Sequence, residues 1–139
     1  MKEIKKEYYQ GGAVQAEYSC EDDELDGVSR FFYENGHLMR EAEFKKGLQD
    51  GMTREYYENG ALMAEGTFQE GKQEGVAKSY YENGRLQSEA HFKNGVLSGT
   101  VKGYFEDGKP QGEWHYIEGR LIPAGKNPPP PNLFFYPQH

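Results

Sequence analysis

The 139-residue sequence predicts an all-β fold: a single-layer antiparallel β-meander solenoid of about five 24-residue β-hairpin repeats. Glycine recurs every 24 residues in three registers that stay in phase along the chain. The registers are Gly36, Gly60, Gly84 and Gly108; Gly27, Gly51, Gly75 and Gly99; and Gly47, Gly71, Gly95 and Gly119. Apolar and polar residues alternate with a period of two, and glycine is too frequent for helices. Both observations indicate hairpins that feed directly into one another.

The repeats divide the chain into two regions. The repeat domain covers residues 1–123, with units at about 4–27, 28–51, 52–75, 76–99 and 100–123. The first and fifth units depart from the others at the hairpin turn, as terminal copies of repeat proteins often do. Residues 124–139 form a proline-rich and aromatic C-terminal tail.

The stretch FFYENGHLMREAEF, residues 31–44, defines the predicted hairpin. Asn35 and Gly36 suit a two-residue type I′ turn, because both positions of that turn need positive φ. The resulting register places a base opposite an acid in every repeat: Lys6 and Glu17, Arg30 and Glu41, Arg54 and Glu65, Lys78 and Glu89, and Lys102 and Glu113. Such exposed pairs fix the register of the strands more than they stabilise the fold.

The same register sorts the side chains onto two faces of the sheet. One face is expected to be packed through aromatic stacking between neighbouring repeats, with rings covering strand glycines. Its members are the pairs Gly51–Phe68, Gly75–Phe92 and Gly99–Tyr116, together with Tyr33, Tyr57, Tyr81, Phe105, Leu38, Leu62 and Leu86. The other face is expected to be partly solvated and to bind a protein partner. It carries Phe32, Tyr56, Tyr80 and Tyr104 beside Met39 and Met63, flanked by the charge pairs.

Composition and charge exclude several classes of partner. The net charge is −7 and the hydrophobic share is 35%. A negative chain disfavours nucleic acid and anionic membranes, which call for clusters of Lys and Arg, and favours a basic protein. The N-terminal residues MKEIKKEYYQ contain no apolar segment, and no stretch is long enough to span a membrane. We therefore expect a cytoplasmic protein.

The acidic residues are densest in CEDDELDG, the first connection between repeats. Glu21, Asp22, Asp23, Glu24 and Asp26 crowd this segment. One interpretation is that they mimic nucleic-acid phosphates and dock in a basic cleft of the partner. The other is that they form a solvated loop, which is the commoner role of charge runs. The segment lacks the ligand spacing and central glycine of an EF-hand loop, which argues against calcium.

The sequence offers no set of residues suited to catalysis, to a cofactor or to a metal. His91 and His115 lie 24 residues apart and should share a face, but no third ligand is defined beside them. A Ser-His-Asp arrangement and a phosphate-binding glycine loop are both missing, since the recurrent glycines belong to turns. Cys20 stands where later repeats place an aromatic ring, which predicts a small apolar filler. We therefore expect a protein that is not an enzyme.

Two of the repeat units, YYENGALMAEGTFQEGKQEG and YYENGRLQSEAHFKNGVLSG, carry a resemblance to a known family. They resemble the bacterial variant of the MORN repeat, whose consensus runs close to Tyr-Tyr-x-Asn-Gly-x-Leu, then Glu, then Phe-Lys-Asn-Gly. The resemblance covers residues 4–123 and is strongest in the second to fourth copies. The eukaryotic pattern with its Tyr-x-Gly-x-Trp core is different.

The resemblance implies a non-enzymatic binding protein. Bacterial proteins built wholly from this variant are often assigned to an antitoxin or immunity family, whose members neutralise a toxin by direct binding. A toxin or effector domain is therefore the expected partner, and the negative charge of the chain favours a basic one. The alternative is a scaffold or membrane-associated interaction protein built from the same repeats.

The C-terminal tail interrupts the repeat pattern. Prolines at 128–131 favour an extended segment, which is followed by Leu133, Phe134, Phe135 and Tyr136. This apolar group is expected either to cap the open edge of the last hairpin or to dock on a partner.

Overall fold

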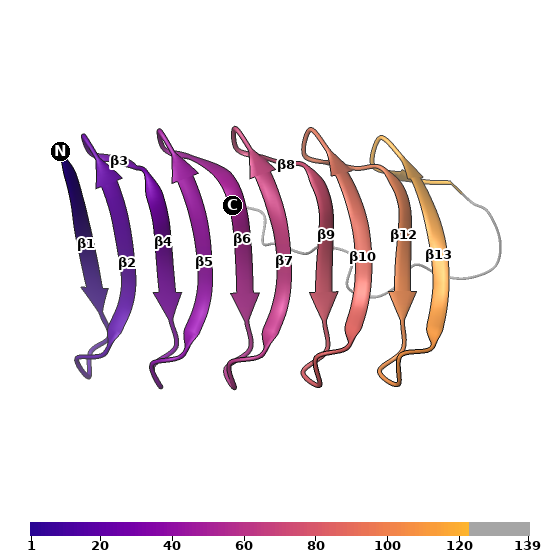
Figure 1. Ribbon diagram of the computed structural model, residues 1–139, viewed down its shortest axis with the longest axis horizontal. Helices are drawn as coiled ribbons and strands as arrows, with labels where there is room; N and C mark the ends of the chain where they lie inside the picture. Colours follow the sequence, from indigo (N-terminus) through magenta and orange to yellow (C-terminus); the bar gives the residue numbers. More distant parts are fainter. Residues whose placement is uncertain (123–139) are drawn as a thin grey trace.

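The structure, a computed structural model, describes residues 1–122 and consists of one antiparallel sheet. Five hairpins stand side by side along its long axis (Figure 1). They are β1 (Lys2–Tyr8) with β2 (Val14–Glu21), β4 (Gly27–Phe32) with β5 (Leu38–Lys45), β6 (Leu48–Tyr56) with β7 (Leu62–Gln69), β9 (Gly75–Tyr80) with β10 (Leu86–Lys93), and β12 (Gly99–Tyr104) with β13 (Pro110–Ile117). The predicted fold class is confirmed. The tail at 124–139, predicted to cap the sheet or dock on a partner, lies outside the described residues.

The predicted type I′ turn at Asn35-Gly36 is wrong. The loop between β4 and β5 has three residues, since the Tyr33 N–H donates to the His37 carbonyl and the Gly36 N–H donates to the Tyr33 carbonyl. Gly36 has a φ of 91°, whereas Asn35 is not among the residues with positive φ. Asn35 instead accepts a hydrogen bond from the His37 N–H at 2.9 Å. A three-residue loop that ends in a left-handed glycine produces a bulge in the following strand.

Two-residue turns with positive φ occur at the opposite end of the sheet, in the connections between repeats. Lys46 and Gly47 have φ values of 50° and 83°, and the same pair of signs recurs in each later connection. In the first connection Asp22 and Asp23 take these positions. Four short strands follow these turns: β3 (Glu24–Leu25), β8 (Lys72–Gln73), β11 (Val96–Leu97) and β14 (Arg120–Leu121). The geometry that type I′ turns require is therefore met here rather than at Asn-Gly.

The register of the hairpins is confirmed away from the loops. All five predicted pairs of a base with an acid face each other, and so do the pairs of a strand glycine with an aromatic ring. Near the loops the register shifts by one residue: Phe31 faces Arg40, but Phe32 faces Leu38 rather than Met39. The same shift occurs in the other hairpins. A shift of one residue moves side chains to the other face, so the predicted places of the leucines and methionines are reversed.

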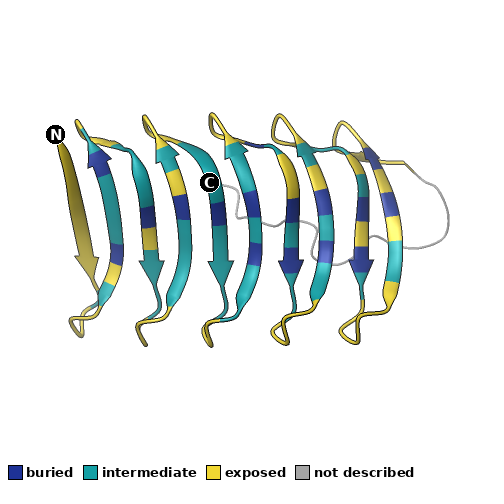
Figure 2. Cartoon of the chain, in the orientation of Figure 1, coloured by how far each residue is buried: buried dark blue, intermediate teal, exposed yellow. Residues whose placement is uncertain are grey.

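The most buried side chains are small, which differs from the predicted core of stacked rings. The fully buried positions form rows across the centre of the sheet (Figure 2). They include Ala16, Ser29, Ala42, Thr53, Ala64, Ala77, Ser79, Ser88, Ala90 and Val101. Phe68, Phe92 and Leu97 are only partly buried and pack against this core. Large buried rings occur at the C-terminal end, where Trp114 and Tyr116 lie. We call the side of the sheet that carries these residues the packed face.

Cys20 belongs to the packed face as predicted. It is buried and free, opposite Glu3 on one side and Leu25 on the other.

A row of tyrosine hydroxyls joins each repeat to the next at the loop end of the sheet. Each hydroxyl donates to a backbone carbonyl of the following hairpin: Tyr9 to Phe32, Tyr33 to Tyr56, Tyr57 to Tyr80 and Tyr81 to Tyr104. The distances lie between 2.5 and 2.7 Å. The fifth repeat has Phe105 at this position, 51% exposed and without a hydroxyl. The row of donors therefore ends where the described hairpins end.

We expect Tyr57→Phe to lower the free energy of unfolding by about 1 kcal/mol, because it removes one hydrogen bond and leaves a carbonyl with one partner fewer. Urea unfolding followed by circular dichroism measures this change. The matched control is Phe105→Tyr, which adds a hydroxyl where no following hairpin is described to accept it. The control should change stability by less than about 0.5 kcal/mol. Equal effects of the two substitutions would contradict the role of the hydroxyl row.

Candidate functional site

The charge pairs form one continuous row across the sheet. Within each hairpin a base faces an acid, and between hairpins the acid faces the base of the next repeat, as Glu17 faces Arg30 and Glu65 faces Lys78. The row runs Lys6, Glu17, Arg30, Glu41, Arg54, Glu65, Lys78, Glu89, Lys102, Glu113. Its sign alternates at every strand. We call the side of the sheet that carries this row the ladder face.

Ion pairs within the row are close at its centre. Arg54 lies between two acids, with Nε 3.3 Å from an oxygen of Glu65 and Nη1 3.8 Å from an oxygen of Glu41. The Arg30 Nε is 3.5 Å from the other oxygen of Glu41. These groups are partly exposed, so each pair stabilises the fold by only about 0.2 to 1 kcal/mol. Their main effect is on register, because a slip by one strand residue would remove every pair at once.

A second row on the ladder face consists of aromatic rings. Phe32, Tyr56, Tyr80 and Tyr104 occupy the same register in β4, β6, β9 and β12, as predicted, and all are half-buried. The hydroxyl of Tyr56 donates to Glu41 at 3.4 Å, and that of Tyr80 donates to Glu65 at 3.0 Å. Burial, followed by this hydrogen bond to Glu65, raises the pKa of Tyr80 to about 12. The Tyr80 hydroxyl therefore stays protonated at neutral pH, and the hydroxyls of Tyr56 and Tyr80 both contact acids of the charge row.

Tyr8 belongs to the same row and was missed by the sequence analysis. It faces Val14 in the register in which Phe32 faces Leu38, and it is 57% exposed. Its spacing of 24 residues from Phe32 was the signal that could have found it.

Met39 and Met63 do not belong to this row, which corrects their predicted placement. Each is the extra residue of a bulge, since Phe32 faces Leu38 and Tyr56 faces Leu62. The equivalent residue of the last hairpin is Gln111, whose Oε1 lies 3.6 Å from the point where a Cβ on Gly103 would stand. Gly103 faces the packed side together with the Trp114 ring. The bulge thus turns this position away from the ladder face.

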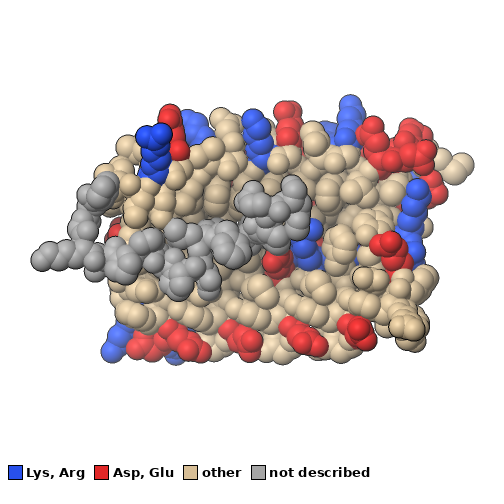
Figure 3. All heavy atoms as spheres, turned by 180° about the vertical axis from the view of Figure 1, so that it is seen from behind, with Lys and Arg blue, Asp and Glu red and all other residues tan. Residues whose placement is uncertain are grey.

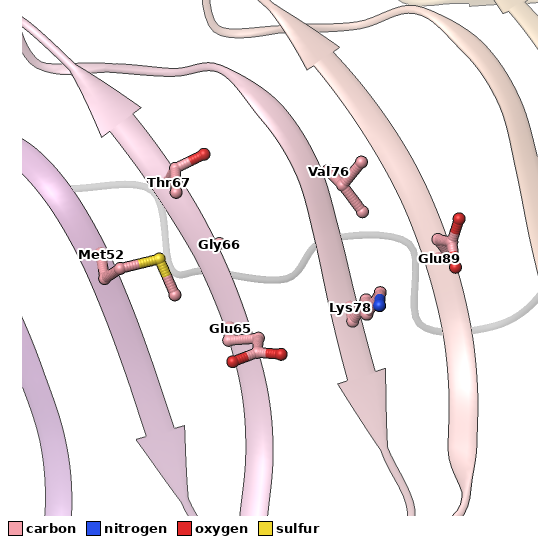
Figure 4. A pocket seen from close by; sticks show the side chains of 7 residues that line it. All are labelled: Met52, Glu65, Gly66, Thr67, Val76, Lys78 and Glu89. Atoms are coloured by element: carbon pink, nitrogen blue, oxygen red, sulfur yellow. The ribbon is translucent and has the colours of Figure 1, made fainter.

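The centre of the ladder face is slightly hollowed. The hollow is lined by Met52, Glu65, Gly66, Thr67, Val76, Lys78 and Glu89, which come from the neighbouring strands β6, β7, β9 and β10 (Figure 4). Its floor is formed by the short side chains of Thr67 and Val76, and charged groups of the ladder row stand at its side. It is open and shallow rather than enclosed, which suits a protruding side chain of a protein better than a small molecule.

The acidic connection lies apart from the aromatic row. The five acids from Glu21 to Asp26 stand at the connection end of the first two hairpins, whereas the aromatic row lies toward the hairpin loops (Figure 1). Much of their charge is paired within the chain. The N-terminal amine lies 3.0 Å from Glu21 and 3.3 Å from Asp22, and Lys5 Nζ lies 3.8 Å from Asp23. The structure therefore does not bring the two predicted sets of binding residues together.

A family model described as the MORN repeat variant matches four segments of the chain, at residues 25–46, 49–70, 73–94 and 97–118. These segments cover more than half of the sequence. The chain belongs to the MORN repeat variant family. No curated protein matches the chain. Repeats of this family indicate a repeat-based binding scaffold, and each matched segment corresponds to one hairpin.

Asp26 has a structural role that recurs in the MORN repeats. Its carboxylate accepts the N–H of Lys46 at 3.3 Å, a residue whose φ of 50° marks the next connection. Asp50 accepts the N–H of Glu70 in the same way, and Glu74 accepts that of Asn94. The hydrogen bond from Lys46 and the nearby Lys2 hold the pKa of Asp26 below its usual value. Asp26 thus orders the neighbouring connections, a role that the regular spacing of 24 residues from Asp26 to Asp50 and from Asp50 to Glu74 could have signalled.

The hairpin loops of the MORN repeats form an acidic rim. Glu34, Glu58, Glu82 and Glu106 are exposed at equivalent positions of successive loops. Seen from behind, acidic side chains line this edge of the molecule (Figure 3). Only the side-by-side arrangement of the hairpins (Figure 1) shows that these residues form a row.

The described residues offer no group of three or more His, Cys, Asp or Glu side chains placed to hold a metal ion. His91 faces Val76, and His115 faces Thr100, whose hydroxyl lies 3.0 Å from Nδ1 of His115. The two histidines are thus held apart by the intervening strand β12. Residues 1–122 contain no helix that is long and apolar enough to cross a membrane.

We expect Asp26→Asn to destabilise the protein at neutral pH, with a loss that shrinks as the pH falls. The folded-state pKa of Asp26 is depressed, so its stabilising effect is present above the unfolded value near 3.8 and disappears as the pH drops through the folded value. Thermal unfolding at a series of pH values measures the gap between the variant and the natural chain. Asp23→Asn removes a charge from the same connection and is the matched control. A neutral-pH gap no larger than that of the control would contradict the structural role of Asp26.

Proposed function

We propose that this protein is a non-enzymatic antitoxin or immunity protein that binds a bacterial toxin through its ladder face and blocks the toxin by occlusion. The observation that carries the proposal is the uninterrupted aromatic row, Tyr8, Phe32, Tyr56, Tyr80 and Tyr104, running beside the alternating charges on one side of the sheet. Half-buried tyrosines with anchored hydroxyls are typical of protein interfaces, since they offer large contact area at low cost in side-chain entropy.

The shape of the ladder face supports a protein as the partner. The face is broad and open, and its central hollow between β6 and β10 is shallow. A stable protein interface buries roughly 800 Å² on each side, which a sheet of this length offers and a small-molecule site does not need. Alternating charges also favour one docking register over others, because a shifted partner would meet charges of the wrong sign.

Charge supports a basic partner. The net charge of −7 and the acidic rim of the hairpin loops would attract a positively charged domain and speed its encounter with the chain. Nuclease-type toxins, which bind phosphates, have surfaces of this kind. The resemblance to immunity proteins built wholly from these repeats points to the same class, and it implies action in the cytoplasm.

Affinity capture of the tagged protein from lysate of its own host, followed by mass spectrometry, tests the proposal. One stoichiometric partner with a toxin-like enzymatic domain is the expected result, and the purified chain should abolish that domain's activity when mixed at equimolar ratio. A captured partner whose activity is unchanged would remove the antitoxin role. Capture of lipid or envelope proteins would favour a membrane-associated scaffold instead.

We expect Tyr56→Ala with Tyr80→Ala to weaken binding of the captured partner at least tenfold, because both rings leave the centre of the ladder face. Titration calorimetry measures the affinity, and circular dichroism verifies that the sheet persists. The matched control is Tyr56→Phe with Tyr80→Phe, which keeps the rings and removes only the hydroxyls. Asp22→Lys with Asp23→Lys tests the acidic connection separately. Unchanged affinity in the double alanine variant would place the interface elsewhere.

A further inference from the structure

The two edges of the sheet differ in how they end. At the N-terminal edge, β1 is exposed along its whole length and carries Lys2, Lys5 and Lys6, which guard an edge strand against pairing. At the C-terminal edge, β13 carries no lysine, and its last residue, Ile117, is 60% exposed. In residues 1–122, the short strand β14 faces only Tyr116 and Ile117. Within residues 1–122, Glu113 of β13 therefore has β12 on one side and no described strand on the other.

The charge row specifies what this open edge requires. Four acids of the row, Glu17, Glu41, Glu65 and Glu89, each face a base on the next hairpin. Glu113 is the fifth acid and faces only Lys102 within its own hairpin. A strand added to this edge in the register of the other repeats would place its own residue opposite Glu113. That residue must be Lys or Arg to continue the alternation.

The packed face adds a second requirement. The residue that precedes each base in the chain is small: Ser29, Thr53, Ala77 and Val101. These side chains are fully or almost fully buried. At the C-terminal edge the ring of Trp114 already lies over the backbone, 3.0 Å from the Cβ points of both Gly103 and Gly112. A strand that pairs beside this ring must therefore place a small residue next to its basic one.

The sequence after residue 122 does not repeat the glycine that opens the earlier hairpins. Gly27, Gly51, Gly75 and Gly99 stand at that position with φ between 89° and 115°. The residue 24 positions after Gly99 is Pro123. The sequence therefore contains no sixth repeat unit in register with the other five.

A second copy of the chain also fits poorly on this edge. Pairing β13 with β1 of another molecule would place Lys6 opposite Glu113, but it would also bring Lys5 onto the packed face beside Trp114. Lys5 stands where the internal hairpins carry the small residues just described. The described ion-pair partner of Lys5, Asp23, lies 3.8 Å away and is itself exposed, so burying the Lys5 charge is unfavourable.

We propose that the outer edge of β13 binds an extended strand of a partner protein, with Lys or Arg opposite Glu113 and Ser, Thr, Ala or Val just before it. The added strand extends the sheet by backbone hydrogen bonds, and Glu113 selects its register and sequence. This inference rests on the proposed function, since the strand belongs to the protein that the chain binds. It names a second contact, at the end of the sheet rather than on the ladder face.

The chain contains one tryptophan, which stands at this edge and makes the inference directly testable. The probe is a synthetic peptide, GVAKSYY, with the sequence of residues 75–81, and the control peptide GVAESYY reverses the charge. The full chain is titrated with each peptide while the fluorescence of Trp114 and the hydrogen exchange of residues 112–114 are followed. We expect the lysine peptide to bind at least tenfold tighter than the control peptide and to slow exchange at these amides.

Reversing the charge of residue 113 gives the decisive experiment. Glu113→Lys should invert the preference, so that GVAESYY binds tighter than GVAKSYY. Glu118→Lys, which changes an exposed acid outside the charge row, should leave the preference unchanged. Equal response to both peptides, or a preference that Glu113→Lys does not alter, would overturn the inference.

Two further outcomes would assign the edge to another occupant and equally overturn the inference. A response to the lysine peptide only after removal of residues 123–139 would mean that the chain's own tail covers the edge. Association with rising concentration, lost in Glu113→Lys and restored by combining it with Lys6→Glu, would mean a second copy. Light scattering after gel filtration detects this case.

The two proposals, strand binding at the edge of β13 and toxin binding on the ladder face, can be contradicted independently of each other. A captured toxin that binds Glu113→Lys normally but not the Tyr56→Ala, Tyr80→Ala variant would keep the proposed function and remove the edge. Peptide binding as expected, without capture of any toxin, would keep the strand-binding edge and remove the proposed antitoxin function.

Discussion

Every strand of residues 1–122 depends on the strand beside it, because these residues form one sheet and supply no second layer against which its faces could be buried. Contacts along the sheet must therefore do what sheet-on-sheet packing does in a sandwich. Three sets of contacts repeat every 24 residues. Opposite charges meet at mid-strand, tyrosine hydroxyls reach the next hairpin at the loop end, and Asp26 and its equivalents hold the connections at the other end. Each hairpin is therefore held to its neighbours at three positions: the middle of the strands, the loop end and the connection end.

The parts of the fold that depend on residue spacing within one repeat were predicted correctly. Glycine spacing gave the repeat, and the pairs of a base with an acid gave the register in the middle of each hairpin, because both depend on residues close in sequence. The continuous charge row was not foreseen. It needs the register between hairpins, which the turn residues of a single hairpin do not determine.

The errors of the prediction have a common source in the loops. Asn-Gly is the strongest short signal for a two-residue type I′ turn. Here, however, only Gly36 has positive φ, and the side chain of Asn35 accepts a hydrogen bond from the His37 N–H. The third loop residue creates a bulge, and the bulge reverses the faces of Leu38 and Met39. The ion pairs of the acidic connection could not be foreseen for a different reason. Its partners lie at the N-terminus about twenty residues away, and no local pattern links them.

The hydroxyl row that ends at Phe105 implies that the repeat region can change in length only by whole repeats of 24 residues. Any internal repeat could be duplicated or deleted without disturbing its neighbours, because each donor finds an equivalent carbonyl and each acid an equivalent base. An insertion of any other length would leave tyrosines without acceptors and charges facing their own kind. The final repeat is the exception, since its phenylalanine and its unshared glutamate suit only the last place in the row. Lineages of such proteins should therefore grow from the middle, lengthening their recognition surface in fixed steps while keeping the same two ends.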